Sequence, residues 1–344
     1  MKILGIESSC DETAASVVQD GRIILSNVVN SQIDIHTLYG GVVPEVAARS
    51  HIEVVNPVVN QALSEANLTW DDIDAIAVTY APGLIGSLLI GTLAARTLAV
   101  LKNKPLYPIH HVEAHVYANF LNKNAPEFPM LALIVSGGHS QLVLFKDHGD
   151  YELLGQTCDD AVGEAFDKVA KIIGLPYPGG PSIAKAALEG NPLAYKLPKA
   201  KMHGAYDFSF SGLKTAVLRA VQREVGVDFT FPSTGLAELL NKQQQYDFAA
   251  SFQRIAIETL VDKTEQAYRD YNPKSVVIAG GVAANQELRR ILSERLPLQI
   301  DYAPIGLCTD NAAMVATLGY YQSLKNKPIS PFDLEVLPSL SMTR

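Results

Sequence analysis

"KILGIESSCDETAASVVQDGRIILSN", residues 2–27, and "MLALIVSGGHSQLVLFKDHGDYELLGQT", residues 130–157, share one plan. Each stretch predicts an apolar strand, a turn of small and polar residues, a second strand, a tight turn and a third strand. A plan that occurs twice at this length indicates duplicated units, and such a repeat constrains the fold more than any single motif.

Each triplet of strands leads into a helical pattern. The first helix is predicted from Pro44 to about Asn67, because proline suits the first turn, and the second from Gly163 to Ile173. A further strand, a Gly-containing loop and a helix follow in both halves, the first of these strands at Asp74–Tyr80. Paired β-β-β-α-β-α units are the plan of the actin-like (ASKHA, RNase H-like) fold. We therefore predict a duplicated α/β fold with two lobes and a cleft between them.

The lobe boundaries follow from the repeat. Residues 1–109 are predicted to form the first lobe, to which the segment from about 311 to 344 returns. Residues 110–310 are predicted to form the second lobe, with a mostly helical insertion at about 184–245 that matches neither repeat.

Composition excludes several classes of protein. The net charge of -8 argues against a generic nucleic-acid coat, and the three widely spaced cysteines indicate a reducing compartment. Residues 75–95 carry no charge and are long enough to span a bilayer. Pro82 and Gly83 divide this run into a strand and a helix, so we expect a buried α/β unit in a cytoplasmic protein without a membrane partner.

"HHVEAH", residues 110–115, is the strongest metal motif of the chain. On a helix His111 and His115 lie one turn apart on one face, and Asp310 in "LCTDNAAM" is the best third ligand. Two histidines and a carboxylate leave coordination positions open for a further ligand. Surface or capping histidines, and an N-cap role for Asp310, are the alternatives.

Three turns at predicted strand ends suit phosphate groups. The chain has neither a P-loop nor a clean GxGxxG, but Glu7–Thr13, Ser136–His139 and Gly280–Asn285 are rich in small residues. Simple hairpins are the alternative for each turn. Asp11 and Glu12 could act as a base, orient a substrate or be solvated turn residues, whereas nothing in the sequence indicates a reactive Cys10.

Lysines, arginines and aromatic residues interleave between residues 195 and 223. Such a segment suits contacts with phosphates and bases. A solvated helix face over core aromatics explains the same composition.

Over nearly its full length the sequence resembles the tRNA threonylcarbamoyladenosine transferase family of the TsaD type, once described as glycoproteases. The stretches that carry the resemblance are "GIESSCDETA", "YGGVVPEVAARSH", "HHVEAH", "IVSGGHSQLV", "DDAVGEAFDKVAK", "YPGGP", "FSFSGLKTA", "GGVAAN" and "CTDNAAM". The resemblance implies transfer of a threonylcarbamoyl group from threonylcarbamoyl-adenylate to N6 of the adenosine 3′ of the anticodon, in tRNAs that read codons starting with A, with release of AMP.

The resemblance also assigns site residues. His111, His115 and Asp310 would bind one divalent metal, iron(II) before zinc. The catalytic candidates are Asp11, Glu12 and His139, which the resemblance itself does not assign. The residues that would hold the adenylate are Ile134, Val135, Ser136, Gly137, Gly138, Asp167, Gly180 and Asn285. The implied partners are tRNA, a paralogous actin-like protein (TsaB-type) without the metal histidines and a small P-loop ATPase (TsaE-type).

Two positions depart from the family pattern. Ala184 stands where many members have an acidic residue near the ribose, and Ala81-Pro82-Gly83 replaces the usual Gly-Pro-Gly. Three other functions stay open from the residues alone. They are a metallopeptidase in which Glu113 activates water, a non-catalytic actin-like ATP-binding protein, and a carbamoyltransferase that acts on a small hydroxyl compound.

Overall fold

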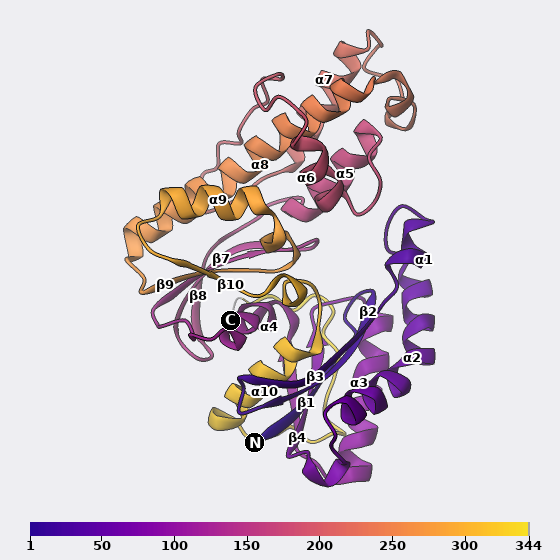
Figure 1. Ribbon diagram of the computed structural model, residues 1–344, viewed down its shortest axis with the longest axis vertical. Coiled ribbons are helices and arrows are strands. Elements are labelled where there is room, and N and C mark those ends of the chain that lie inside the picture. Colours follow the sequence, from indigo (N-terminus) through magenta and orange to yellow (C-terminus); the bar gives the residue numbers. More distant parts are fainter. Residues whose placement is uncertain (343–344) are drawn as a thin grey trace. The chain divides into compact units, whose positions relative to one another are not determined.

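Two five-stranded mixed sheets form the framework of the chain, which confirms the duplicated α/β plan (Figure 1). The computed structural model describes residues 1–342. The chain forms two compact units. Unit 1 contains Met1–Glu127, Lys146–Tyr151 and Asp301–Arg344, and unit 2 contains Phe128–Phe145 and Glu152–Ile300.

These units differ from the predicted lobes in three segments. Residues 110–127, 146–151 and 301–310, all predicted in the second lobe, belong to unit 1. The physical reason is packing: α4 (His111–Tyr117) and the short turn Ala118–Leu121 lie against α10 (Ala312–Lys325), and α10 lies on the first strand. All of "HHVEAH" is thereby part of unit 1.

The sheet of unit 1 has the strand order β3-β2-β1-β4-β5. The first three strands are antiparallel, and β4 and β5 run parallel to β1. Helices α2 and α3 pack against β2 and β4 on one side, and α10 packs against β1 and β4 on the other (Figure 1). The elements are β1 (Lys2–Glu7), β2 (Glu12–Gln19), β3 (Ile23–Ser31), α1 (Ile33–Thr37), α2 (Pro44–Glu65), β4 (Ala75–Ala81), α3 (Ile85–Lys102) and β5 (Leu106–His110).

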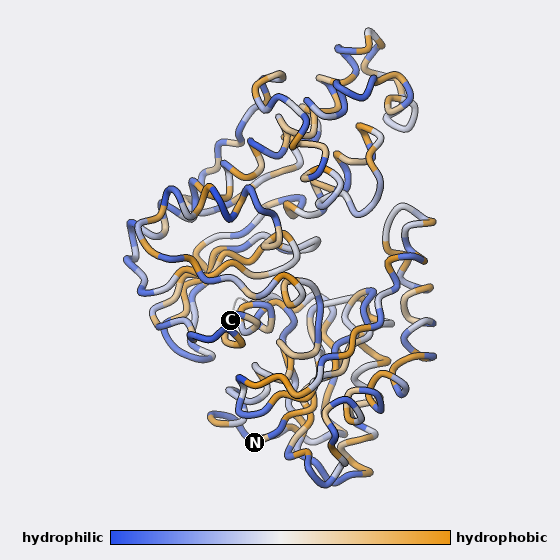
Figure 2. Tube along the Cα trace, in the orientation of Figure 1, coloured by the Kyte–Doolittle hydropathy of each residue, from blue (hydrophilic) through white to orange (hydrophobic). Residues whose placement is uncertain are grey.

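Local sequence explains these elements. Every residue of β1 after Lys2 is buried, because helices cover both faces of the sheet. Residues 3–6 are therefore a continuous apolar run, which ends at the buried Glu7 (Figure 2). Asp20 and Gly21 have φ angles of 50° and 65°, as a tight hairpin turn between β2 and β3 requires. Helix α2 begins with Pro44 and confirms the first predicted helix.

The apolar run 75–95 is buried only in part. Its strand β4 is buried at all positions except Tyr80, as expected. On α3, however, Ile85, Leu89 and Leu93 are 60%, 48% and 61% exposed, so the expectation of a buried helix is wrong for this face. Among the described residues α3 is the one helix long and apolar enough to cross a membrane, and its other face packs on α2 and β4 as in a layered α/β domain.

Unit 2 repeats the strand plan with a larger helical layer. Its sheet has the order β10-β9-β6-β7-β8, with β6 antiparallel to β7 and parallel to β9. Helix α5 confirms the second predicted helix. The segment 184–245 contains one complete helix, α7, and two short 3-10 turns between irregular stretches, so the expectation of a mostly helical insertion is wrong. The elements are β6 (Met130–Val135), β7 (Ser140–Asp147), β8 (Asp150–Gln156), α5 (Val162–Ile173), α6 (Gly179–Ala187), α7 (Ser211–Glu224), α8 (Lys242–Tyr271), β9 (Ser275–Ala279), α9 (Gln286–Arg295) and β10 (Ile300–Tyr302).

Gly5 of β1 allows α10 to approach the sheet. A Cβ atom there would lie 2.3 Å from the Ala312 carbonyl oxygen and 2.7 Å from the Ala316 nitrogen.

We predict that Gly5→Ala lowers the free energy of unfolding by about 1–3 kcal/mol, because a backbone shift must relieve the overlap. Gly212→Ala, at a helical position with open space around it, is the control and should be neutral or slightly stabilising. Chemical denaturation of both variants measures the difference, and equal stability would contradict the packing argument.

Candidate functional site

Three parallel strands of unit 1 end side by side. β1 ends at Glu7, β4 at Ala81 and β5 at His110. Parallel neighbours bring their carboxyl ends to one edge of the sheet, which is where open α/β sheets place ligands. Helix α4 begins directly after β5, so the two histidines lie at this edge.

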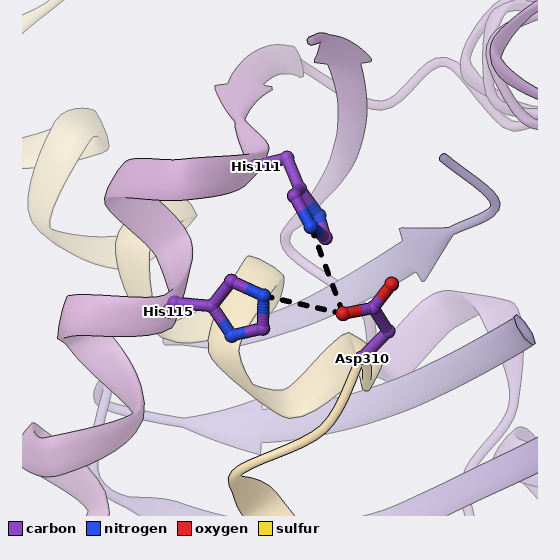
Figure 3. Close-up of side chains that lie close together, drawn as sticks. All are labelled: His111, His115 and Asp310. Atoms are coloured by element: carbon purple, nitrogen blue, oxygen red, sulfur yellow. Dashed lines mark ion pairs between the residues drawn. The ribbon is translucent and has the colours of Figure 1, made fainter. Parts of the chain in front are cut away.

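His111, His115 and Asp310 converge there (Figure 3). The two histidines lie one turn apart on α4 with ring centroids 4.7 Å apart, which confirms the predicted helix. Oδ1 of Asp310 lies 3.6 Å from Nε2 of His111 and 3.2 Å from Nε2 of His115. One ligand atom from each of the three residues lies within 4.8 Å of the others. The sequence therefore identified a cluster that the fold assembles from α4 and the loop before α10.

The alternative role of Asp310, as the N-cap of the last helix, is wrong by one residue. Asn311 is the N-cap of α10, and its Oδ1 accepts a hydrogen bond of 3.1 Å from the Met314 N–H. Helix capping therefore does not explain the position of Asp310.

The cluster fits a divalent metal. Both histidines are buried, and neither ring nitrogen of His115 has a hydrogen-bond partner among residues 1–342, although Nε2 lies close to Asp310. A bound cation would provide Nε2 of His115 with a partner, which the described protein atoms do not provide through a hydrogen bond. Two imidazoles and one carboxylate suit zinc or iron(II) and leave positions for a further ligand. Glu113, between the histidines in sequence, is not one of the converging residues.

Glu7 lies beside His111 and was not singled out by the sequence. Its carboxylate is fully buried and lies 3.2 Å from Nδ1 of His111. Burial alone would raise the pKa of Glu7, but the charge of His111 and the hydrogen bonds from His111 and Thr79 together outweigh it, and the pKa is lowered. Burial alone would lower the pKa of His111, but Asp310 and Glu7 outweigh it and raise the pKa to about 9. A positive charge on His111 therefore offsets part of the negative charge of these two carboxylates.

The turn between β1 and β2 adds further acidic groups to unit 1. Burial, followed by the charges of Asp310 and Asp11, raises the pKa of Glu12 to about 9. Its carboxyl group accepts a hydrogen bond of 3.1 Å from Ser31. The Ser9 hydroxyl of this turn lies 3.1 Å from Nδ1 of His111, so the turn belongs to the same site. Burial, with the charges of Asp11 and Asp310, also raises the pKa of the Cys10 thiol, so Cys10 is a turn residue and not a nucleophile.

In unit 2 the predicted phosphate turns follow two adjacent parallel strands. Ile134 and Val135 end β6, and Ser136–His139 follows, whereas Gly280–Asn285 follows β9. The Ser136 N–H donates to the His139 carbonyl at 2.8 Å, and its carbonyl accepts from the Gly163 N–H at 3.2 Å. Cβ atoms at Gly137 and Gly138 would meet nothing within 4 Å. Both glycines therefore leave their backbone open to a ligand.

The other predicted ligand residues of unit 2 lie on the helices around this turn. Asp167 of α5 accepts a hydrogen bond of 2.7 Å from the Gly179 N–H, next to Gly180 in the first turn of α6. Burial raises the pKa of Asp167. Asn285 caps α9 and donates to Oε1 of Gln253 at 2.9 Å. His139 thus belongs to unit 2, whereas the other catalytic candidates, Asp11 and Glu12, belong to unit 1.

The interleaved basic segment is mainly structural. Phe208 and Phe210 are fully buried, so they are core residues. Lys199 pairs with Asp262 at 2.6 Å, and Lys214 pairs with Asp160 at 3.4 Å. Lys214 lies on α7 and Lys199 in an irregular stretch, and both contacts favour paired surface lysines over core aromatics.

Known sequences resemble the chain over its whole length. The sequence profile of the TsaD family, described as tRNA N6-adenosine threonylcarbamoyltransferase, matches residues 23–317. A protein of that name from Dehalococcoides mccartyi is 52% identical over 343 residues, which is 100% of both chains. One from Symbiobacterium thermophilum is 53% identical over 322 residues, 93% of this chain and 91% of its own.

The chain belongs to the TsaD family.

Solved structures with lower identity support the fold alone. HypF of T. kodakarensis has a TM-score of 0.60 at 15% identity, over 94% of this chain and 48% of its own. The (R)-2-hydroxyglutaryl-CoA dehydratase component A of Acidaminococcus fermentans has a TM-score of 0.51 at 15% identity, over 94% of this chain and 100% of its own.

The two departures from the TsaD pattern lie in different settings. Ala184 is half-buried on α6, one turn after Gly180, and offers no carboxylate there. Ala81 is fully buried at the end of β4. A Cβ at the next glycine of the loop, Gly83, would lie 2.6 Å from the Ser9 carbonyl oxygen. The close approach of the loop to the β1–β2 turn thus depends on Gly83.

Removal of the two histidines should abolish metal binding. We predict that the chain, stripped with a chelator, binds one equivalent of Zn²⁺. His111→Ala combined with His115→Ala should weaken binding by more than about 100-fold, because loss of a ligand's hydrogen-bond partner alone costs about 10–100-fold. Calorimetric titration measures this, and His203→Ala, at an exposed histidine of unit 2, is the control. Equal affinity of the double variant and the wild type would contradict the metal site.

Proposed function

We propose that this protein is a tRNA N6-adenosine threonylcarbamoyltransferase. Its donor is threonylcarbamoyl-adenylate, and its acceptor is N6 of the adenosine 3′ of the anticodon in tRNAs that read codons starting with A. The observation that carries the proposal is 52% identity over the full length of a relative with that activity in its name. The convergent His111, His115 and Asp310 support it further.

The proposed reaction is an acyl transfer. The N6 amine forms a bond to the carbamoyl carbon, the bond from that carbon to the phosphate oxygen breaks, and AMP leaves with the electron pair. The amine loses one proton. No peptide bond is involved, and Glu113 lies outside the metal-type cluster, so no observation favours the metallopeptidase.

The three residues of the cluster would hold one divalent metal, and we propose iron(II), with zinc as the alternative. A cation bound there supplies positive charge for the phosphate and carbonyl oxygens of the donor. Asp310 contributes the one negative charge among its three protein ligands, so net positive charge is left for an anionic donor. His111 and His115 fix this position because both side chains are buried on α4.

The turns of unit 2 are proposed to hold the adenylate. Gly137 and Gly138, after β6, leave backbone N–H groups open to an anion. The proposed adenylate contacts also include Ile134, Val135, Ser136, Asp167, Gly180 and Asn285. Because Ala184 offers no carboxylate, the ribose would lack the acidic contact that many members have.

Three residues are proposed to accept the amine proton or to orient the amine: Asp11, Glu12 and His139. Glu12 is the candidate with a strongly raised pKa, about 9, so it is protonated at neutral pH in the absence of a cation. Positive charge near Asp310 would favour its ionised form.

Partners are proposed to complete the activity in the cytoplasm. The net charge of -8 indicates that the chain alone is a weak ligand for tRNA. We propose a small P-loop ATPase as one partner and a paralogous actin-like protein as the other. The paralogous protein would dock on α2 and α3, where Ile52, Ile85, Leu89 and Leu93 are exposed.

The activity is tested with the chain, its partners, synthetic threonylcarbamoyl-adenylate and unmodified tRNA. We expect modified nucleoside from the wild type, and at least about 100-fold less from the double variant of His111 and His115, because loss of the cation removes several kcal/mol of charge stabilisation. Chromatography of the digested tRNA measures the product.

Two controls accompany this assay. His203→Ala and Glu113→Gln should both form product at the wild-type rate, because neither residue belongs to the cluster. Product at the wild-type rate from the double variant would contradict a role for the metal. A wild type that forms none with active partners would contradict the proposed function.

The docking surface is tested separately. Leu89→Asp combined with Leu93→Asp places two charges on the exposed face of α3 and should weaken the complex with the paralogous partner at least about 30-fold, as loss of a central apolar contact does. Leu188→Asp, at a leucine of unit 2 that is 82% exposed, is the matched control. Analytical ultracentrifugation measures both affinities, and undiminished binding by the α3 variant would place the partner elsewhere.

A further inference from the structure

Glu7 is a buried carboxylate to which the proposed reaction assigns no role. It ends β1 and is 0% exposed. Its Oε1 accepts a hydrogen bond of 2.6 Å from the Ser9 N–H. Its Oε2 accepts one of 2.6 Å from the Thr79 hydroxyl of β4, and Nδ1 of His111 lies 3.2 Å from the same oxygen. Residues from three chain segments thus meet at this one side chain.

The pattern of donors determines the role of Glu7. The Ser9 N–H can only donate, and the Thr79 hydroxyl donates to the other carboxylate oxygen. A carboxylate that accepts from both sides is an acceptor for its third contact as well. Nδ1 of His111 must therefore carry the hydrogen in this contact.

The position of that hydrogen fixes the other ring nitrogen. A neutral imidazole with Nδ1–H has its lone pair on Nε2. Nε2 is the atom of His111 that faces Asp310 at 3.6 Å. His115 differs, because its Nδ1 has no hydrogen-bond partner within residues 1–342. Among the described residues, Glu7 therefore fixes the position of the ring hydrogen in His111 and makes no such contact with His115.

We propose that Glu7 is a positioning residue for the metal centre. Its carboxylate accepts the Nδ1–H of His111 and thereby holds Nε2 of the same ring towards the cation. The proposal rests on the proposed metal site and not on the transfer reaction. Thr79 and the Ser9 N–H orient the carboxylate of Glu7. Residues at the carboxyl ends of β1 and β4 therefore align His111, a proposed metal ligand on α4. Such partners of ligating histidines set ring orientation and basicity and are worth about 10–100-fold in metal affinity.

Glu7→Gln tests this contact with little change of volume. An amide cannot satisfy all three neighbours. If its oxygen faces His111, its NH₂ group opposes the Ser9 N–H. If its NH₂ group faces His111, Nδ1 must accept and the hydrogen moves to Nε2, where it blocks coordination. We expect the Zn²⁺ affinity to fall by about 10–100-fold relative to wild type, measured by competition with a chromophoric chelator.

Ser9→Ala is the matched control, because the Ser9 hydroxyl lies 3.1 Å from the same Nδ1. This variant keeps Glu7 and the Ser9 N–H, so its affinity for Zn²⁺ should lie within about threefold of wild type. Such a ratio corresponds to less free energy than one ordinary hydrogen bond contributes. Thr79→Val removes one donor to Glu7 and should weaken binding by less than Glu7→Gln. A large loss for Ser9→Ala with none for Glu7→Gln would overturn the proposal in favour of the serine.

A measurement on the wild type makes the test independent of how the variants fold. In Zn²⁺-loaded protein with ¹⁵N-labelled histidine, His111 should carry its hydrogen on Nδ1. A hydrogen on Nε2 would overturn the proposal even if Glu7→Gln were unstable. Wild type that binds no Zn²⁺ would remove the metal site and the role of Glu7 together, whereas equal binding by wild type and folded Glu7→Gln would remove only the role of Glu7.

Discussion

A carboxylate buried away from water needs a positive charge or several hydrogen bonds beside it, and three carboxyl groups of unit 1 lie near one sheet edge. Glu7 is fully buried, and Asp310 and Glu12 are close enough to influence each other's ionisation. Protonated His111 and a protonated Glu12 relieve this charge in the absence of a cation. A divalent cation would relieve it more completely. The electrostatics of the chain therefore match a metal-dependent enzyme.

The two units use one strand plan for different chemistry. In unit 1 the turn after the first strand carries acidic residues, and the strand itself ends in Glu7. In unit 2 the corresponding turn is Ser136–His139, whose glycines leave the backbone open. Side chains thus form the group that could hold a metal in one unit, whereas backbone groups are suited to a ligand in the other. Function on this duplicated fold follows from turn composition and not from the fold itself.

The sequence predicted the parts of this architecture that depend on local pattern. The strand triplets, the helix from Pro44 and the pairing of His111 with His115 follow from periodicity, and all are present. The boundary at residue 110 did not follow, because α4 is held in unit 1 by packing on α10, a contact between distant segments. The N-cap was misplaced by one residue, since Asp310 and Asn311 are both good capping residues. The exposed face of α3 was missed because composition alone does not distinguish a buried apolar helix from a docking surface.

The contacts of Glu7 were also outside the reach of sequence reasoning. An acidic residue at the end of an apolar strand was visible in "KILGIE", but Thr79 and His111 are distant in the chain. Only the parallel order of β1, β4 and β5 brings the three together. Residue types thus indicated the group that could hold a metal, whereas the contact between Glu7 and His111 required the tertiary structure.

The most direct test of this account is an anomalous-scattering map of crystals of the zinc-loaded protein. The account predicts one peak within about 2.0–2.2 Å of Nε2 of His111, Nε2 of His115 and a carboxylate oxygen of Asp310. It further predicts that Nδ1 of His111 keeps its contact with Glu7. No peak at these residues in a crystal that contains zinc, or a peak bound through Nδ1 of His111, would contradict it.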